Sequence, residues 1–288
     1  GSSSSQSQSQ SSANNAKGSN VNAGGNIKIA ATGAGKDSNL TVQGSDIKAV
    51  GTTSLKADNQ VNLLAAQNTT QESSSNKSSS ASVGLAISTQ GVGVTASASK
   101  ATGQGAGNGT TYTNSHIEGG QRVQIESGGD TTIKGATVTG KQITAQVGGD
   151  LNVQSLQDQN RYNEKSQSVG GSAMVGITST GPASGNLSLG KTSINSQYTS
   201  VNEQSAIRAG DGGFNVNVQG KTDLKGGQIT STQAAIDNNK NSYEAKQGTT
   251  TSDLNNSASY DAKSVSVGIS AGSVPGQKIG RASCRERV

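Results

Sequence analysis

Apolar side chains in this chain come in short alternating runs, a pattern that predicts β-strands. Ile143, Ala145 and Val147 are separated by single polar residues, and similar runs begin after Ser19. Alternation over three to five residues buries one face of a strand and leaves polar residues on the other. No stretch combines a helical period with capping residues. The sequence therefore predicts an all-β chain with almost no helix.

The predicted strands recur at a step of about twenty residues. Val123 and Ile125 are followed twenty residues later by Ile143 and Ala145. Such a step is typical of a parallel β-solenoid, because each coil then stacks like side chains on the next. One coil cannot bury its apolar face alone, whereas a stack can. The further matches are Asp130 with Asp150, Ile133 with Val153, Ile27 with Ile47 and Ile29 with Ala49.

A longer period of 92 residues overlies the short one. "VGL" at 83–85 returns as "VGI" at 175–177 and at 267–269, each time beside Ser-rich flanks. A second similarity, Tyr-x-x-Lys-Ser-x-Ser-Val-Gly, spans 162–170 and 260–268. We interpret the long unit as two or three coils followed by a β-hairpin that projects from the solenoid, and the chain holds nearly three such units.

Each projecting hairpin is expected to contain four parts. A polar arm such as 70–82 would lead to the "VGL" strand, then to a Gly-rich turn such as "GQGAGNG" at 103–109, and finally to a return strand. Clusters of glycine between strand patterns are typical of turns.

Both ends of the chain differ from the repeats. Residues 1–18 form a Ser/Gln-rich low-complexity segment without apolar side chains larger than Ala, so we expect a solvated linker or mobile loop, with structure beginning after it. Residues 279–288, "IGRASCRERV", match without a mismatch the translation of ATC GGA AGA GCG TCG TGT AGG GAA AGA GTG, which resembles a common short-read sequencing adapter. We expect this tail to be a translation artefact. The predicted solenoid then spans 19–278.

Composition narrows the possible classes. Hydrophobic residues make up 29% and aromatic residues 2%, which leaves a repetitive β-structure or a disordered polar chain. The tail holds three Arg and one Glu, so removing it lowers the formal net charge from +5 to +3 and gives no indication of a nucleic-acid partner. The tail also holds the only cysteine, Cys284, so neither a disulfide nor a thiolate metal site is expected.

No motif points to catalysis or to cofactor binding. A Ser-His pair or a zinc site would depend on His116, the only histidine, and a zinc site needs three or four ligands. "GAGKDS" at 33–38 has the Gly-Lys step of a P-loop. However, Ala30 stands at the position of the first P-loop glycine, and Asp37 stands at the position of the Ser or Thr that follows the lysine. The Gly-Gly steps before Asp130 and Asp150 recur before Asn26, which favours turn residues that cap backbone NH groups over calcium ligands. We therefore predict no catalytic residue, no cofactor, no metal and no small-molecule substrate.

The tyrosines are the candidates for surface contact, since tyrosine is favoured at interfaces and other aromatic residues are nearly absent. All five fall in the polar flanks and not in the regular strand patterns. Each is expected either to contact a partner or to pack over the base of a hairpin. The candidates are Tyr112, Tyr162, Tyr198, Tyr243 and Tyr260.

Residues 68–88, 148–168 and 260–270 resemble the haemagglutinin repeats of filamentous-haemagglutinin-like exoproteins, which include the contact-dependent growth inhibition proteins of Gram-negative bacteria. The resemblance covers about 19–276. It implies a right-handed β-helix filament, exported through an outer-membrane pore by two-partner secretion and displayed on the cell surface. In the growth-inhibition branch it implies a section associated with passing a C-terminal toxin through the outer membrane of the target cell.

Together these observations predict a secreted, non-catalytic filament section of a large bacterial surface exoprotein that supports contact-dependent toxin delivery. The expected partners are the export pore and a target-cell or host-cell surface. An adhesin shaft that binds host surfaces is the main alternative, and a disordered secreted linker is another. An enzyme would need acidic and basic side chains gathered in one cleft, whereas the charged residues, 14% of the chain, are scattered.

Overall fold

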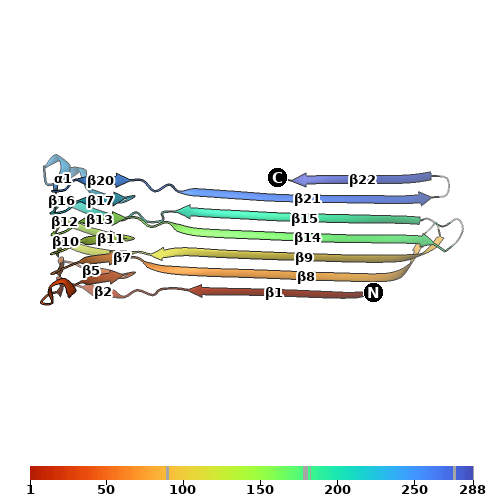
Figure 1. Cartoon of the computed structure of the whole chain (residues 1–288), viewed down its shortest axis with the longest axis horizontal. Coiled ribbons are helices and arrows are strands. Elements are labelled where there is room, and N and C mark those ends of the chain that lie inside the picture. Colours follow the sequence, from red (N-terminus) through yellow and green to blue (C-terminus); the bar gives the residue numbers. More distant parts are fainter. Residues whose placement is uncertain (89–90, 178–180, 182, 275–276, 288) are drawn as a thin grey trace.

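The computed structural model describes residues 1–88, 91–177, 181, 183–274 and 277–287, and it is all-β. Within these residues the only helices are α1 (Gln233–Asp237) and a 3₁₀ turn, η1 (Gly35–Asp37), which agrees with the predicted near absence of helix. The molecule has two parts, a stack of coils and a long flat sheet that projects from it (Figure 1). We call these parts the coil stack and the projecting sheet.

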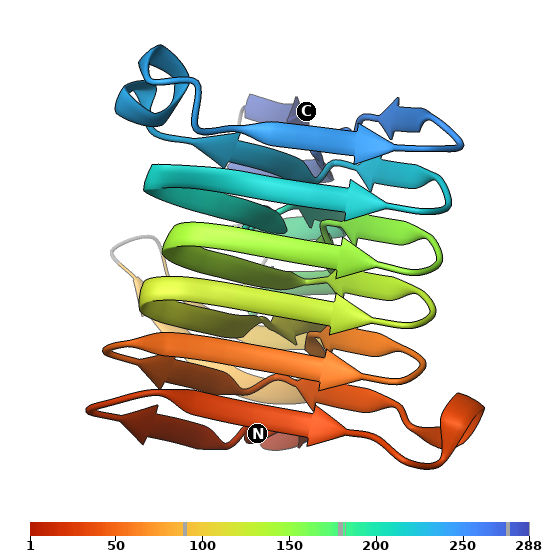
Figure 2. The same cartoon turned by 90° about the vertical axis from the view of Figure 1, so that its left-hand side faces the viewer.

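The coil stack consists of two parallel sheets, of nine and six strands, and its coils lie one above another in chain order (Figure 2). The nine strands are β2 (Asn20–Ala23), β3 (Ile27–Ala31), β5 (Asp46–Ala49), β6 (Thr52–Ala57), β10 (Ser115–Ser127), β12 (Ala136–Val147), β16 (Ala206–Val218), β18 (Gln228–Ser231) and β19 (Ser242–Ala245). The six strands are β4 (Leu40–Gln43), β7 (Val61–Leu64), β11 (Thr131–Lys134), β13 (Leu151–Gln154), β17 (Thr222–Lys225) and β20 (Thr249–Ser252).

Like residues stack on like residues in the core of the coil stack. Val123 pairs with Ile143, and Ile133 pairs with Val153, so the step of twenty residues is confirmed for these coils. All four side chains are fully buried. Each coil therefore covers the apolar face of its neighbour, which is how a chain with so few hydrophobic residues obtains a core.

The first coil has a longer step than the sequence predicted. Ile27 pairs with Thr53 and Ile29 with Leu55, so matching Ile27 and Ile29 to Ile47 and Ala49 is wrong. Ile47 stacks instead on Val21. The physical reason is the loop that contains η1, which adds residues to this coil without moving its strands out of register.

The Gly-Gly-Asp and Gly-Gly-Asn steps are coil corners. Asp130 Oδ1 accepts a hydrogen bond from the backbone NH of Asp150 at 2.8 Å, and Asp150 Oδ1 accepts one from Lys221 at 2.9 Å. Asn26 Oδ1 accepts the equivalent bond from Thr52 at 2.8 Å. The prediction that these residues cap backbone NH groups is confirmed, and each cap joins one coil to the next.

We expect Asp150→Ala to lower the free energy of unfolding by about 1 kcal/mol, because the NH of Lys221 loses its acceptor at a coil corner. Urea denaturation followed by circular dichroism measures the effect. Asp150→Asn is the control, since an amide oxygen serves as acceptor at Asn26. Equal stability of the alanine variant and the wild type would contradict a capping role.

The projecting sheet has seven antiparallel strands in the order β1-β8-β9-β14-β15-β21-β22. Hairpins β8–β9 and β14–β15 leave the stack between coils and return to it, so the expectation of projecting hairpins is confirmed (Figure 1). The strands are β1 (Ser2–Asn14), β8 (Ala66–Ser88), β9 (Gly91–Thr113), β14 (Asp158–Gly176), β15 (Ala183–Ser200), β21 (Ser257–Val274) and β22 (Gln277–Arg287).

Two expectations about polar segments are wrong. The Ser/Gln tract forms strand β1, paired along its length with β8, so structure begins at Ser2 and not after Gly18. The glycines of 103–109 lie inside β9 and form no turn. They are needed for space, because a Cβ on Gly107 would lie 3.2 Å from the Tyr162 ring and one on Gly103 would lie 2.2 Å from Asn76 Oδ1.

Candidate functional site

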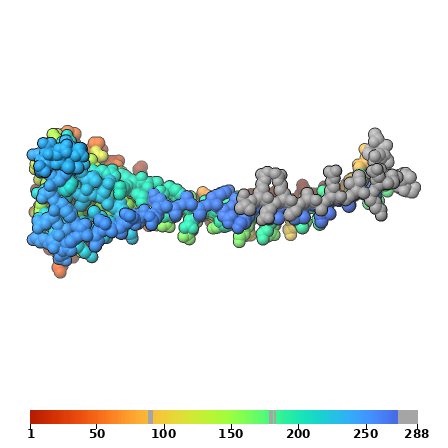
Figure 3. Space-filling view, turned by 90° about the horizontal axis from the view of Figure 1, so that it is seen from above, coloured from red at the N-terminus to blue at the C-terminus, as the bar shows by residue number. Residues whose placement is uncertain are grey.

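The projecting sheet is a single layer with two exposed faces, and it is much thinner than the coil stack (Figure 3). Paired residues of neighbouring strands point to the same face, and residues alternate between faces along each strand. The register therefore divides the side chains into two sets. We call them the valine–lysine face (odd residues of β8, β14, β15 and β21, even residues of β9) and the serine–glycine face (the remaining residues of these strands).

Large aliphatic side chains are exposed on the outer half of the valine–lysine face. Leu85 is 72% exposed and Ile87 is 83% exposed, in a region that a soluble protein normally keeps polar. The other exposed aliphatic residues of this outer half are Val83, Val92, Val94, Val169, Val175, Leu187, Leu189, Val265 and Ile269. We call this set the apolar end.

A belt of lysines crosses the same face where the apolar end stops. One lysine comes from each of five consecutive strands, within three neighbouring rows of the register: Lys77, Lys100, Lys165, Lys191 and Lys263. All five are exposed. Among the described residues, the one ion pair of this lysine belt joins Lys263 to Asp261 at 3.4 Å. The belt is therefore a line of largely uncompensated positive charge.

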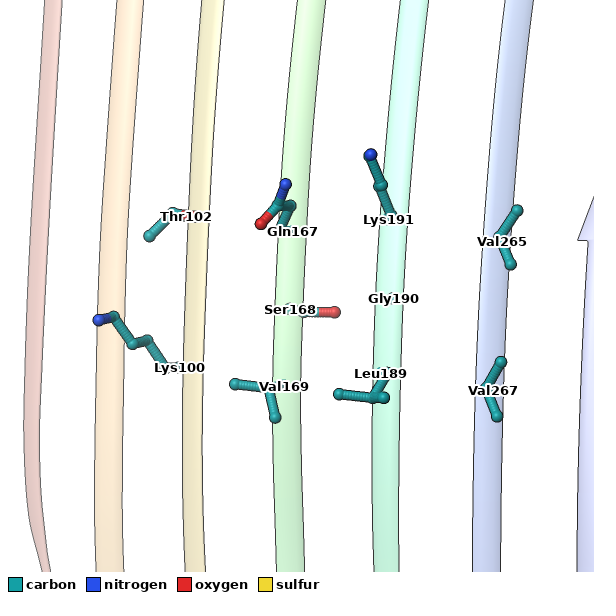
Figure 4. A pocket seen from close by; sticks show the side chains of 10 residues that line it. All are labelled: Lys100, Thr102, Gln167, Ser168, Val169, Leu189, Gly190, Lys191, Val265 and Val267. Atoms are coloured by element: carbon teal, nitrogen blue, oxygen red, sulfur yellow. The ribbon is translucent and has the colours of Figure 1, made fainter.

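A hollow lies at the border between the lysine belt and the apolar end (Figure 4). Lys100, Val169, Leu189 and Val267 lie in one row, and Lys191 stands in the next row beside Val265. Ammonium groups and exposed aliphatic groups are thus neighbours on one surface. Such a surface suits an anionic amphiphilic partner. The anionic part of the partner would meet the ammonium groups, and its apolar part would meet the neighbouring aliphatic groups.

The serine–glycine face has the opposite character. Its hydroxyl groups pair across strands, as Ser80 does with Ser99 at 2.8 Å and Ser82 with Ser97 at 2.6 Å. In the described parts of β8, β9, β14, β15 and β21, this face carries no lysine or arginine. Its charged residues are Glu72, Glu164 and, at the base, the buried Asp158.

Three of the five candidate tyrosines meet on the serine–glycine face, near the coil stack. Tyr162 and Tyr260 lie in one row with Ser196 between them, and Tyr198 lies one row closer to the stack. Tyr260 is 70% exposed and Tyr198 is 42% exposed. We call Tyr162, Tyr198 and Tyr260 the tyrosine patch.

The other two tyrosines lie elsewhere. Tyr112 is half-buried at the base of β9, where its backbone NH donates to Asp158 Oδ1 at 2.9 Å, and Tyr243 lies in β19 of the coil stack. All five tyrosines are in strands, so placing them in polar flanks outside the regular strands was wrong. The polar sequence around them concealed strands that pair through their backbone.

Glycines of the neighbouring strand leave room for the ring of Tyr162. Its ring lies over Gly105 and Gly107 of the neighbouring strand, and its hydroxyl donates to Glu164 Oε2 at 2.9 Å. The Glu164 carboxylate that accepts this bond raises the pKa of Tyr162. The ring therefore lies along the sheet, whereas Tyr260 is free to meet a partner.

His116 ties the coil stack to the base of the second hairpin. Its Nδ1 contacts Asp46 Oδ1 at 2.7 Å, and its Nε2 contacts Glu203 Oε2 at 3.0 Å. Partial burial lowers the pKa of His116, but the hydrogen bonds to Asp46 and Glu203 outweigh this effect, so the pKa lies above its ordinary value of 6.5. Sequence alone missed both partners, because they lie far away in the chain.

We expect the protonated His116 to stabilise the fold at low pH. Because the folded-state pKa is raised, this contribution is complete below pH 6.5 and is lost as the pH rises through the folded-state pKa. Solvent screens the partly exposed side chain, so the loss is below about 1 kcal/mol. Urea denaturation across this pH range measures it, with His116→Asn as the control that removes the dependence. The same pH dependence in both proteins would contradict the assignment.

Residues 1–170 match the family model described as "Hemagglutinin repeat". The chain therefore belongs to the haemagglutinin-repeat family. The resemblance to the repeat region of filamentous-haemagglutinin-like and contact-dependent growth inhibition exoproteins is thus confirmed. Haemagglutinin-repeat proteins of this kind are secreted and displayed on the outer surface of Gram-negative bacteria, in agreement with the predicted location.

Curated relatives of this haemagglutinin-repeat chain are proteins named CdiA. "Toxin CdiA" of Escherichia coli is 38% identical over 266 residues, 89% of this chain and 8% of the relative. "16S rRNA endonuclease CdiA" of Enterobacter cloacae is 40% identical over 285 residues, 97% of this chain and 8% of the relative. "Deoxyribonuclease CdiA" of Yersinia pseudotuberculosis is 36% identical over 224 residues, 77% of this chain and 21% of the relative. No solved structure matches the chain.

The haemagglutinin-repeat chain spans a small part of these relatives, less than a tenth of the two longer matches. The toxin and nuclease names belong to the full-length relatives and not to the section that this chain matches. Among the described residues, no three His, Cys, Asp or Glu side chains lie close enough together to hold a metal ion. Likewise, no helix in the described part has the length and apolar character needed to cross a membrane.

The lysine belt left a signal in the sequence that single-strand patterns did not reveal. Lys165 and Lys263 occupy the same place in the repeated motif at 162–170 and 260–268. The motif places tyrosine on one face and lysine on the other, because the two are three positions apart along a strand. Repeated charge within the long unit, and not only repeated apolar residues, therefore marks the belt in the sequence.

Proposed function

We propose that this chain is a non-catalytic filament section of a large secreted exoprotein and supports contact-dependent toxin delivery to neighbouring cells. The coil stack forms the shaft, a right-handed parallel β-helix, and the projecting sheet meets the surface of the target cell. The names of the relatives and the haemagglutinin-repeat family support this assignment. Its other partner is the outer-membrane pore that exports the parent protein.

The observation that carries the proposal is the apolar end bordered by the lysine belt. The exposed side chains of Leu85 and Ile87 are suited to the apolar interior of a lipid layer. The lysine belt lies closer to the coil stack, where its ammonium groups are suited to anionic headgroups. Long lysine side chains keep their charge at such a boundary while their stems cover apolar surface. The contact therefore needs no chemistry from the chain, in keeping with a non-catalytic role.

Substituting the apolar end tests the proposal in the intact exoprotein. We expect Leu85→Ser, Ile87→Ser, Leu187→Ser and Leu189→Ser together to abolish inhibition of target cells while surface display, measured with an antibody, is unchanged. The matched control places four alanines on the other face: Ser82→Ala, Ser97→Ala, Ser172→Ala and Ser188→Ala. Full inhibition by the apolar-end variant would refute the proposed contact.

An adhesin shaft is the second candidate, and the exposed tyrosine patch favours it. In that case purified chain blocks attachment of bacteria to host cells, and a Tyr198→Ser, Tyr260→Ser variant does not. A disordered linker, the third possibility raised by composition, is contradicted by the paired strands that run through the described residues.

We further propose the domain division 1–18, 19–278 and 279–288, with the last ten residues foreign to the natural protein. Strand β22 includes most of this tail and forms one edge of the projecting sheet. Long-read sequencing of the genomic locus tests the proposal. Finding codons for "IGRASCRERV" at this position in the genome would overturn it.

A further inference from the structure

The serine–glycine face is an uncovered sheet face that lacks the usual protection against association. Exposed β-structure is normally kept apart by charged side chains, especially lysine. All the lysines of β8, β9, β14, β15 and β21 lie on the opposite face. The hydroxyl groups of the serine–glycine face already bond to one another, so covering them leaves few unpaired groups.

The serine–glycine face carries large side chains at one end, which makes that end high, and small side chains at the other, which makes that end low. The tyrosine patch and Ile194 stand near the coil stack, whereas the outer half carries mostly Ser and Gly, such as Ser97, Gly170 and Ser188. A second face of the same shape fits against it when its direction is reversed. The high end of each face then lies on the low end of the other.

We propose that the serine–glycine face binds the same face of a second copy of this chain, with the two projecting sheets pointing in opposite directions. The contact is isologous and closes as a two-fold dimer, so it does not propagate. The coil stacks are thicker than the sheets, and reversing the sheets keeps the two stacks at opposite ends of the dimer (Figure 3).

The area of the face is sufficient for a stable dimer. Five strands spaced about 4.8 Å apart and about 18 residues long, at about 3.3 Å per residue, give a face of about 1,400 Å². A standard protein interface buries about 800 Å² on each partner. Partial overlap of the two sheets therefore meets the requirement.

Charge selects the serine–glycine face over the valine–lysine face. Two valine–lysine faces in reversed contact would bring their lysine belts together near the middle of the sheets, where like charges repel. On the serine–glycine face, Glu72 and Glu164 lie near the coil stack and face the Ser-rich outer half of the other copy. The dimer also leaves both valine–lysine faces outward, so the proposed contact with target cells stays open.

Sedimentation velocity of the purified chain over a range of concentrations tests the dimer without any target cell. We expect a monomer–dimer equilibrium that Ser188→Lys weakens at least tenfold. Leu189→Lys adds the same charge to the adjacent residue on the opposite face and leaves the dimer intact. Tyr198→Ser with Tyr260→Ser also weakens the dimer, whereas Tyr243→Ser, at a similarly exposed tyrosine of the coil stack, does not. Circular dichroism confirms that each variant is folded.

Cross-linking determines the direction of the two sheets. In a Cys284→Ser background, one chain carries Ser184→Cys at the outer end of β15 and the other carries Ser196→Cys near the coil stack. Reversed sheets give a product between the two different chains with a short bismaleimide. A monomer at every concentration, equal effects of Ser188→Lys and Leu189→Lys, or products joining only identical cysteines would overturn the proposal. None of these outcomes bears on toxin delivery, so the two proposals fail independently.

Discussion

Replacing Ile133 with alanine is expected to lower the free energy of unfolding by about 2 to 5 kcal/mol, the largest effect of any single substitution considered for this chain. Ile133 is fully buried in β11 and stacks between Leu63 of β7 and Val153 of β13, which are also fully buried. The missing side-chain atoms leave a cavity that the neighbouring coils cannot close, because their backbone ladders hold them at the spacing of the sheet. Urea denaturation followed by circular dichroism measures the loss.

Ile269→Ala is the matched control for Ile133→Ala. The substitution is the same, but Ile269 is 52% exposed on the projecting sheet, so removing its side chain changes the free energy of unfolding by less than about 0.5 kcal/mol. Equal destabilisation by the two variants would contradict the view that the coil stack holds the core. A larger loss at Ile269 would show that the apolar end is covered in solution.

The coil stack was predictable from sequence because its core leaves a local pattern. Alternating aliphatic residues at a constant step predicted the pairing of Val123 with Ile143 and of Ile133 with Val153. The constant step does not hold at Ile27, where the loop with η1 lengthens the coil, because a loop insertion changes the step without changing the strand pattern. Periodicity in the sequence therefore identifies the coils, whereas the structure is needed to determine which residues of neighbouring coils pair.

The projecting sheet was harder to predict because its strands are held by backbone hydrogen bonds and bury little apolar surface. Residues 1–18 look like a linker, yet Ser2–Asn14 pairs residue by residue with β8, 55 to 79 residues away along the chain. The glycines at 103–109 look like a turn, yet they make room for Tyr162 and Asn76. Local propensity predicted the wrong conformation for both segments, because pairing with strands far away in the sequence decides their conformation.

The candidate site was only partly visible in the sequence. Tyrosines were expected to matter, and three of the five gather in the tyrosine patch, but their position on one face follows from the register of β14, β15 and β21. The lysine belt was missed because its members come from five strands, and no single strand contributes more than one. A line of charge across a sheet has no counterpart in a local sequence window.

Removing three lysines of the belt is expected to lower binding of the purified chain to anionic lipid vesicles about 100-fold. Near an anionic surface each lysine contributes about 1 kcal/mol, so Lys100→Gln, Lys165→Gln and Lys191→Gln together remove about 3 kcal/mol. Co-sedimentation of the purified chain with vesicles of phosphatidylglycerol, compared with phosphatidylcholine, measures the effect. The expected binding to anionic vesicles also weakens with salt, because screening acts on exposed charges.

The control for the belt variant removes three exposed lysines of the coil stack: Lys28→Gln, Lys134→Gln and Lys225→Gln. Both variants lower the net charge equally, so any difference reports the position of the lysines and not the total charge. If the lysine belt meets headgroups while the apolar end enters the layer, the coil-stack variant binds like the wild type. Equal binding of wild type to both kinds of vesicle, or equal losses in the two variants, would show that the belt does not recognise a lipid surface. The contact would then depend on the apolar end alone, and the proposed function would have to rest on a protein partner at the target cell.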